Sequence, residues 1–154
     1  MSLRNKFGTN KDVIEQGAWI DICENEDGTV CRLRVKRMNQ QNPKFQKEMA
    51  NHRNAFQGDH FSAKKIDQVQ ASMIEVVSSS IIVDWEFMDG DGVRGVTTAP
   101  VPEGFPEAKP DRYLPFTREN VRLVLLEFPD LLDLITAQAS DISNFQAKEA
   151  DTKN

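Results

Sequence analysis

The chain has 154 residues, of which 39% are hydrophobic, and its 19 Lys and Arg against 24 Asp and Glu give a net charge of −5. This length fits one domain that buries roughly two thirds of the surface of its unfolded chain. The negative charge argues against a protein that coats nucleic acid, because affinity for phosphate comes mostly from Lys and Arg. Since no signal-peptide pattern and no apolar run of membrane-spanning length occurs, we expect neither export nor a membrane protein.

Residues 1–16 are polar and carry no sustained period, so we expect a flexible N-terminal arm. Residues 18–23 and 30–35 are β-branched, aromatic or alternating, and an acidic, glycine-containing segment separates them. This pattern predicts a β-hairpin. The only cysteines, Cys23 and Cys31, flank its turn and are expected to be free thiols, with a cross-strand disulfide as the alternative.

Helix signals follow the hairpin. Asn42 with a proline after it predicts the start of one helix, and Ser62 predicts the start of a second, which we expect to run on to Trp85. Thr117 opens a third helical region, with an apolar residue before the cap and another four positions after it. Pro129 removes a backbone donor, so this region should break there and restart.

Residues 89–115 hold most of the prolines and are expected to form a surface loop. The chain becomes polar again at its end, which predicts a disordered tail over residues 146–154. The ordered part is then a single domain over residues 17–145. Its fold class is α+β and mainly helical, with an N-terminal β-hairpin packed on three to four α-helices.

The sequence contains no recognisable motif for a catalytic, metal or cofactor site. Asp89–Gly92 resembles the start of a calcium loop, but the fifth and twelfth positions would be Val93 and Pro100, so a tight turn is expected. His52 and His60 have no further donors at ligand spacing. We therefore expect no catalytic residues, no metal and no cofactor, and a protein that is not an enzyme.

Four cations stand close together at the end of the hairpin: Arg32, Arg34, Lys36 and Arg37. Because they alternate largely with apolar residues, they are interpreted as the solvated face of a strand. The alternative is a nucleic-acid-binding regulator, which would use these cations to contact phosphates.

The last helical region carries more large apolar side chains than one buried stripe requires, with Leu131, Leu132, Leu134 and Ile135 close together. One reading is a kinked helix that buries two faces. The other is a groove or landing site for a helix or extended segment of a partner protein.

The order of these features resembles the tail assembly chaperones of long-tailed (siphovirus-type) bacteriophages and prophages. The resemblance rests on five segments in order, namely Gly17–Trp19, Leu33–Val35, Val83–Glu86, Pro115–Asn120 and Asp141–Phe145. It spans about residues 17 to 145 and departs from the family in a longer, proline-rich loop.

The resemblance implies a protein of the bacterial host cytoplasm that binds the tape-measure protein and helps recruit tail-tube subunits. The alternatives are the regulator above and a structural tail component. Self-association is left open, and neither nucleic acid nor membrane is an expected partner. The side chains expected to contact the partner are Leu131, Leu134, Ile135, Phe145, Phe105 and Tyr113.

Overall fold

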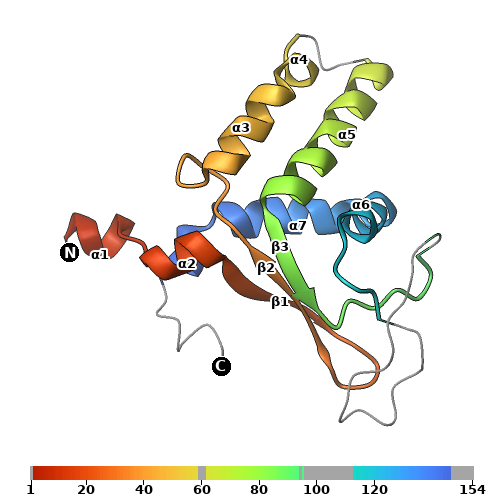
Figure 1. Ribbon diagram of the computed structural model, residues 1–154, viewed down its shortest axis with the longest axis horizontal. Coiled ribbons are helices and arrows are strands. Elements are labelled where there is room, and N and C mark those ends of the chain that lie inside the picture. The colour runs from red at the N-terminus through yellow and green to blue at the C-terminus, as the bar shows by residue number, and fades with distance from the viewer. Residues whose placement is uncertain (1, 59–61, 94, 96–112, 147–154) are drawn as a thin grey trace.

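The structure is a computed structural model that describes residues 2–58, 62–93, 95 and 113–146. The fold is α+β and mainly helical, which confirms the prediction from the sequence (Figure 1). In chain order the elements are α1 (Leu3–Phe7), α2 (Lys11–Gln16), β1 (Ala18–Glu24), β2 (Val30–Val35), α3 (Pro43–Asn51), α4 (Arg53–Phe56), α5 (Ala63–Ser80), β3 (Ile82–Glu86), α6 (Arg118–Glu127), α7 (Pro129–Ser140) and the 3₁₀ helix η1 (Ile142–Phe145).

The sheet has three antiparallel strands in the order β1-β2-β3. The predicted hairpin forms, with Ile20 opposite Leu33, and Trp85 of β3 lies opposite Leu33 on the other side. The prediction that the second helix continues to Trp85 is wrong, because the helix ends at Ser80 and the chain pairs with β2 as a strand. An unbroken apolar run does not by itself distinguish a buried helix from a buried strand. Here the residues after Ser80 form a strand because the edge of β2 that is not paired with β1 is available for pairing.

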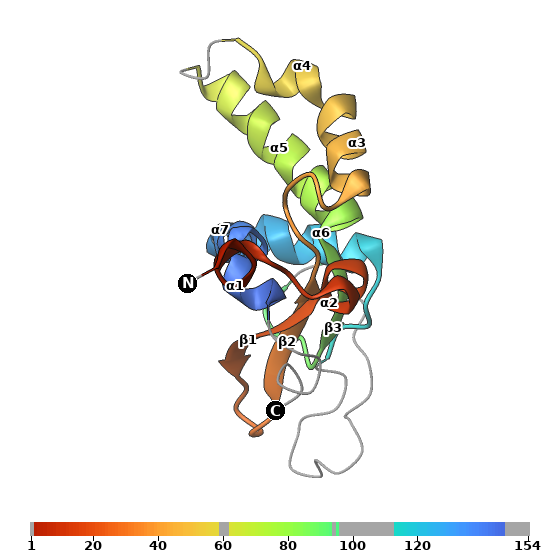
Figure 2. The same ribbon diagram turned by 90° about the vertical axis from the view of Figure 1, so that its left-hand side faces the viewer.

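The helices form two groups around the sheet. α3, α4 and α5 stand away from it as a helical hairpin, and α6 and α7 cross at the base of that hairpin (Figures 1 and 2). α5 packs against α3 and α6, while α7 contacts β2. The most deeply buried apolar side chains, with no exposed surface, are Val35, Val76, Val77, Ile81, Ile135, Ala139 and Phe145.

The predicted helix starts are confirmed. The side chains of Asn42, Ser62 and Thr117 each accept a hydrogen bond from the backbone N–H three residues further on, at 3.1–3.2 Å. These caps satisfy donors that the first turn of a helix leaves free. α7 begins at Pro129, as expected from its missing N–H.

The N-terminal segment contains two short helices, where the sequence predicted no regular structure. Val13 of α2 is 5% exposed and belongs to the core. The backbone N–H of Asn10 donates to the carbonyl of Phe145 at 2.8 Å, and the Gln146 side chain donates to the carbonyls of Lys6 and Gly8. Val13, the partly buried Ile14 and a few hydrogen bonds thus dock this segment, although its sequence shows no regular apolar period.

Only parts of the predicted loop over residues 89–115 are described. The turn at its start is confirmed: the N–H of Asp91 donates to the Asp89 carboxylate at 2.8 Å, and Gly92 has a positive φ of 82°. Asp89 also forms an antiparallel bridge with Tyr113, so the two ends of the loop lie together. Of the predicted tail, residues 147–154 lie outside the described residues.

Candidate functional site

Large apolar side chains are exposed at the junction of α6 and α7 and midway along α7. Leu126 is 62% exposed, Phe128 43% and Leu134 37%; we call these three residues the α6–α7 surface. The chain turns here because Pro129 cannot continue α6, and Phe128 ends one helix and precedes the next without a side-chain cap. Exposed groups of large apolar side chains are typical of surfaces that contact another protein.

Two of the side chains expected to contact a partner keep some exposed surface. Leu134 is exposed, and Leu131 is partly buried against the core. Phe105 lies outside the described residues. The excess of apolar residues in α7 therefore serves both the core and the surface.

Three other residues expected to contact a partner are buried, and this corrects the sequence-based interpretation. Ile135 and Phe145 have no exposed surface and Tyr113 is 4% exposed. The Arg37 guanidinium lies 5.3 Å from the centre of the Phe145 ring, and the Tyr113 hydroxyl lies 3.1 Å from that of Thr29. Ile135 packs in the core, Phe145 holds η1 against the domain and Tyr113 holds the end of the loop, so none of the three is accessible to a partner.

A groove separates the first half of α5 from the start of α7. It has a volume of about 370 Å³ and is lined by Ile66, Val69, Gln70, Met73, Pro129, Leu132 and Asp133. Ile66 is 50% exposed although it belongs to the apolar stripe of α5. Asp133 is the lining residue with a carboxylate, Asp130 is exposed one turn before it on α7, and the sequence has no Lys or Arg from residue 123 to residue 146. The groove is therefore apolar with an acidic border.

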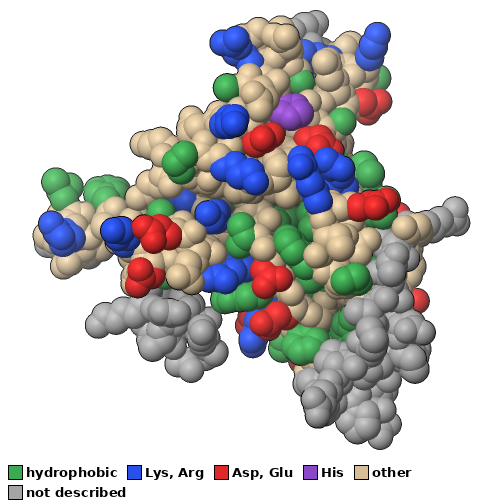
Figure 3. All heavy atoms as spheres, in the orientation of Figure 1, with side chains coloured by type: hydrophobic (Ala, Val, Ile, Leu, Met, Phe, Trp, Pro, Cys, Tyr) green, Lys and Arg blue, Asp and Glu red, His purple; other side chains and the backbone are tan. Residues whose placement is uncertain are grey.

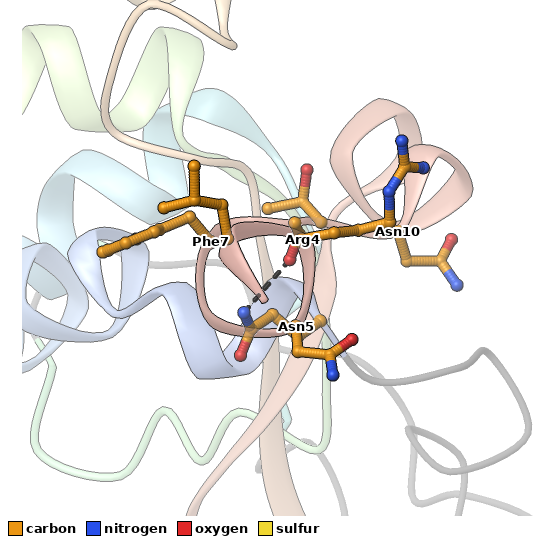
Figure 4. Close-up of a pocket in the computed structure, with 8 residues that line it drawn as sticks. Arg4, Asn5, Phe7 and Asn10 are labelled. Carbon is orange, nitrogen blue, oxygen red and sulfur yellow. Dashed lines mark hydrogen bonds between the residues drawn. The ribbon is translucent and has the colours of Figure 1, made fainter. Parts of the chain in front are cut away.

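A second hollow surrounds α1, with a volume of about 800 Å³ (Figure 4). Leu3 is 79% exposed and Phe7 59% exposed. Figure 4 shows Phe7 and Arg4 extending from α1 toward opposite sides. This short helix thus presents apolar and cationic side chains to solvent.

The cluster of cations at the end of the hairpin is mostly engaged within the protein. Arg32 donates to Asp21 at 2.8 Å, Arg34 donates to Gln16 at 2.9 Å, and Arg37 is buried. The burial of β2 alternates, with Arg32 and Arg34 on the less buried face, which agrees with the interpretation as a solvated strand face for these two residues. The interpretation is wrong for Arg37, which is buried beyond the end of the strand. Figure 3 shows cations and carboxylates interspersed on one face of the molecule. A phosphate-binding surface would need cations without such partners.

The thiols of Cys23 and Cys31 are free, as expected, although the two residues are paired across the strands. Burial raises the pKa of the Cys31 thiol to about 12, with the neighbouring Cys23 adding to the shift. His52 lies 3.9 Å from the Glu48 carboxylate, and His60 is outside the described residues. Within the described ranges no three His, Cys, Asp or Glu side chains are grouped as metal ligands. No helix in the same ranges is long and apolar enough to cross a membrane.

Comparison with known protein families finds a match over most of the chain. A family model described as YdaY prophage protein matches residues 36–154, more than half of the chain. The matched region begins after β2 and contains both the groove and the α6–α7 surface. No curated protein and no solved structure matches the chain. The prophage character expected from the sequence is thereby confirmed, and the chain belongs to the YdaY prophage protein family.

Proposed function

We propose that this protein is a prophage tail assembly chaperone, which binds the tape-measure protein and helps recruit tail-tube subunits without catalysing a reaction. The observation that carries the proposal is the α6–α7 surface, with Leu126 and Phe128 exposed at the junction of two helices and Leu134 exposed midway along α7. The prophage family and the order of sequence features support the tail assembly role. We place its action in the cytoplasm of the bacterial host.

The chemistry of the surface suits a protein that shields apolar helices. Contacts made by Leu and Phe side chains are non-directional, so one surface can accept different apolar segments of a long partner. The carboxylates of Glu127 and Asp130 stand beside these side chains, and the whole chain carries a net charge of −5. Excess negative charge keeps a protein with exposed apolar residues soluble.

A chaperone must also release its partner. Association loses translational and rotational freedom, so contacts by a few side chains give a modest net affinity. The α6–α7 surface has three such side chains and they are only partly exposed. Its contacts are therefore expected to break when tube subunits compete for the same helices.

The direct test replaces the surface residues one at a time. Leu134→Asp adds a charge to a contact side chain, and Ser140→Asp adds the same charge to the exposed last residue of α7, more than one turn away from Leu134. We expect Leu134→Asp to weaken binding of purified tape-measure protein at least tenfold, about 1.4 kcal/mol, and Ser140→Asp to leave it within twofold. Circular dichroism checks that both variants are folded. Equal binding by the two folded variants would exclude this surface.

A second experiment separates a chaperone from a structural tail component. Mass spectrometry of purified particles should show the tape-measure protein without this chain, because a chaperone leaves before assembly is complete. Stoichiometric amounts of the chain in finished particles would favour the structural role instead.

A further inference from the structure

We propose that the protein associates with itself by docking α1 of one copy into the groove between α5 and α7 of another. The inference uses residues outside the α6–α7 surface and does not rest on the proposed tail assembly role. The proposed contact pairs the exposed apolar face of α1, which is flanked by cations, with the apolar groove, which is bordered by carboxylates.

The first partner is α1. Leu3 and Phe7 are four residues apart, so a helix places them on the same face. They are 79% and 59% exposed, so among the described residues this apolar helix face is largely open to solvent, with only the Lys6 ammonium 5.4 Å from the centre of the Phe7 ring. The cations Arg4, Lys6 and Lys11 lie on or beside the helix, and no carboxylate occurs from residue 2 to residue 11.

The second partner is the groove. Its walls are mainly apolar, and its volume of about 370 Å³ far exceeds the ~30 Å³ share of one water molecule, so large side chains can enter it. The carboxylate of Asp133 is part of the lining, and Asp130 is exposed beside it. Lys65 on the α5 side is turned away, since its ammonium group donates to the carbonyl of Asn54 at 3.1 Å. An apolar helix face flanked by cations matches this acidic border.

A second copy is required because α1 is held far from its own groove. Val13 is buried in the core, Asn10 is hydrogen-bonded to Phe145 of η1, and Gln146 is hydrogen-bonded to Lys6. Figure 1 shows α1 on the opposite side of the molecule from α5. The α1 helix of one chain therefore cannot reach the groove of the same chain. It is free to reach the groove of a second chain, because both α1 and the groove are exposed.

The test combines two variants that each lack one half of the contact. Leu3→Asp with Phe7→Asp removes the apolar face of α1, and Ile66→Asp places a charge at the half-exposed edge of the groove. Gln68→Asp, at an exposed position of α5 that does not line the groove, is the control for Ile66→Asp. Sedimentation equilibrium over a concentration series gives the average mass of each protein.

We expect the wild type and Gln68→Asp to gain mass with concentration, and each of the two defective variants to remain monomeric. An equimolar mixture of the defective variants should form complexes of one copy of each, since one supplies an intact arm and the other an intact groove. A wild type that stays monomeric, a groove variant that associates normally, or a mixture that stays monomeric overturns the proposal.

Charge reversal tests the electrostatic half of the contact. Arg4→Glu with Lys6→Glu should weaken self-association at least fivefold, and adding Asp130→Lys with Asp133→Lys to the same chain should restore most of it. The restored variant separates a direct charge contact from a structural effect of the first pair. Failure of the second pair to restore association contradicts the proposed orientation. Replacing residues of the α6–α7 surface should leave the association unchanged, which distinguishes this outcome from failure of the chaperone proposal.

Discussion

The indole of Trp85 links β3 to the segment that leads into α6, and Trp85→Phe measures that link. The Trp85 Nε1–H donates to the backbone carbonyl of Leu114 at 2.8 Å, and both residues are buried. The indole also meets Phe116 edge to face, with ring centres 5.3 Å apart. The phenyl ring keeps most of the apolar contact but removes the donor, so a buried carbonyl loses its partner.

The expected loss of unfolding free energy is about 2–4 kcal/mol, of which about 1–3 kcal/mol comes from the unsatisfied carbonyl and the rest from the space that the smaller ring leaves. Urea unfolding followed by circular dichroism measures it. Trp19→Phe is the matched control, because Trp19 is half-buried and lies under the Arg34 guanidinium rather than donating to a buried carbonyl. We expect the control to lose about 1 kcal/mol or less. Equal losses for the two variants would refute the role assigned to the Trp85 hydrogen bond.

The remaining predictions depend on burial. Ile135→Ala should lower the unfolding free energy by about 2–5 kcal/mol, because this side chain is buried. Leu134→Ala on the same helix should lower it by less than about 1 kcal/mol, because Leu134 is exposed. Urea unfolding of the two variants measures both values. A thiol reagent should modify Cys23 in the native protein and reach Cys31 only after unfolding, as mass spectrometry would show. Since burial raises the pKa of Cys31 to about 12, its stabilising contribution is complete below pH 9 and is lost as the pH rises toward 12, which urea unfolding across this range checks. Glu75→Gln should cost about 1 kcal/mol, because its pairs with two arginines of α6 are partly exposed and screened.

Local signals in the sequence predicted where α3, α5, α6 and α7 begin. Asn42, Ser62 and Thr117 cap helices because their short side chains bond the backbone three residues on, and this interaction needs no tertiary context. The strand β3 was missed because its apolar residues continue the stripe of α5 without a turn signal. α2 was missed because a helix of this length with one buried residue, Val13, leaves no period to detect.

The candidate site was predicted less well than the fold. The sequence indicated an excess of apolar side chains around α7, and the structure confirms that some remain exposed. It did not show which ones, since Leu134 and Ile135 are adjacent in the chain and only packing within the folded domain buries one of them. Leu126 and Phe128 were not among the predicted contacts. The helix break expected at Pro129 was nevertheless a signal, because side chains next to such a bend are often exposed.

The proposed function requires that a partner protein bind at the α6–α7 surface. Hydroxyl-radical footprinting of the purified protein, with and without tape-measure protein, measures this most directly, because it reports the solvent exposure of individual side chains. We expect labelling of Leu126, Phe128 and Leu134 to fall in the complex while labelling of exposed positions on α4 stays constant. Unchanged labelling of these three side chains in a saturated complex would contradict the account.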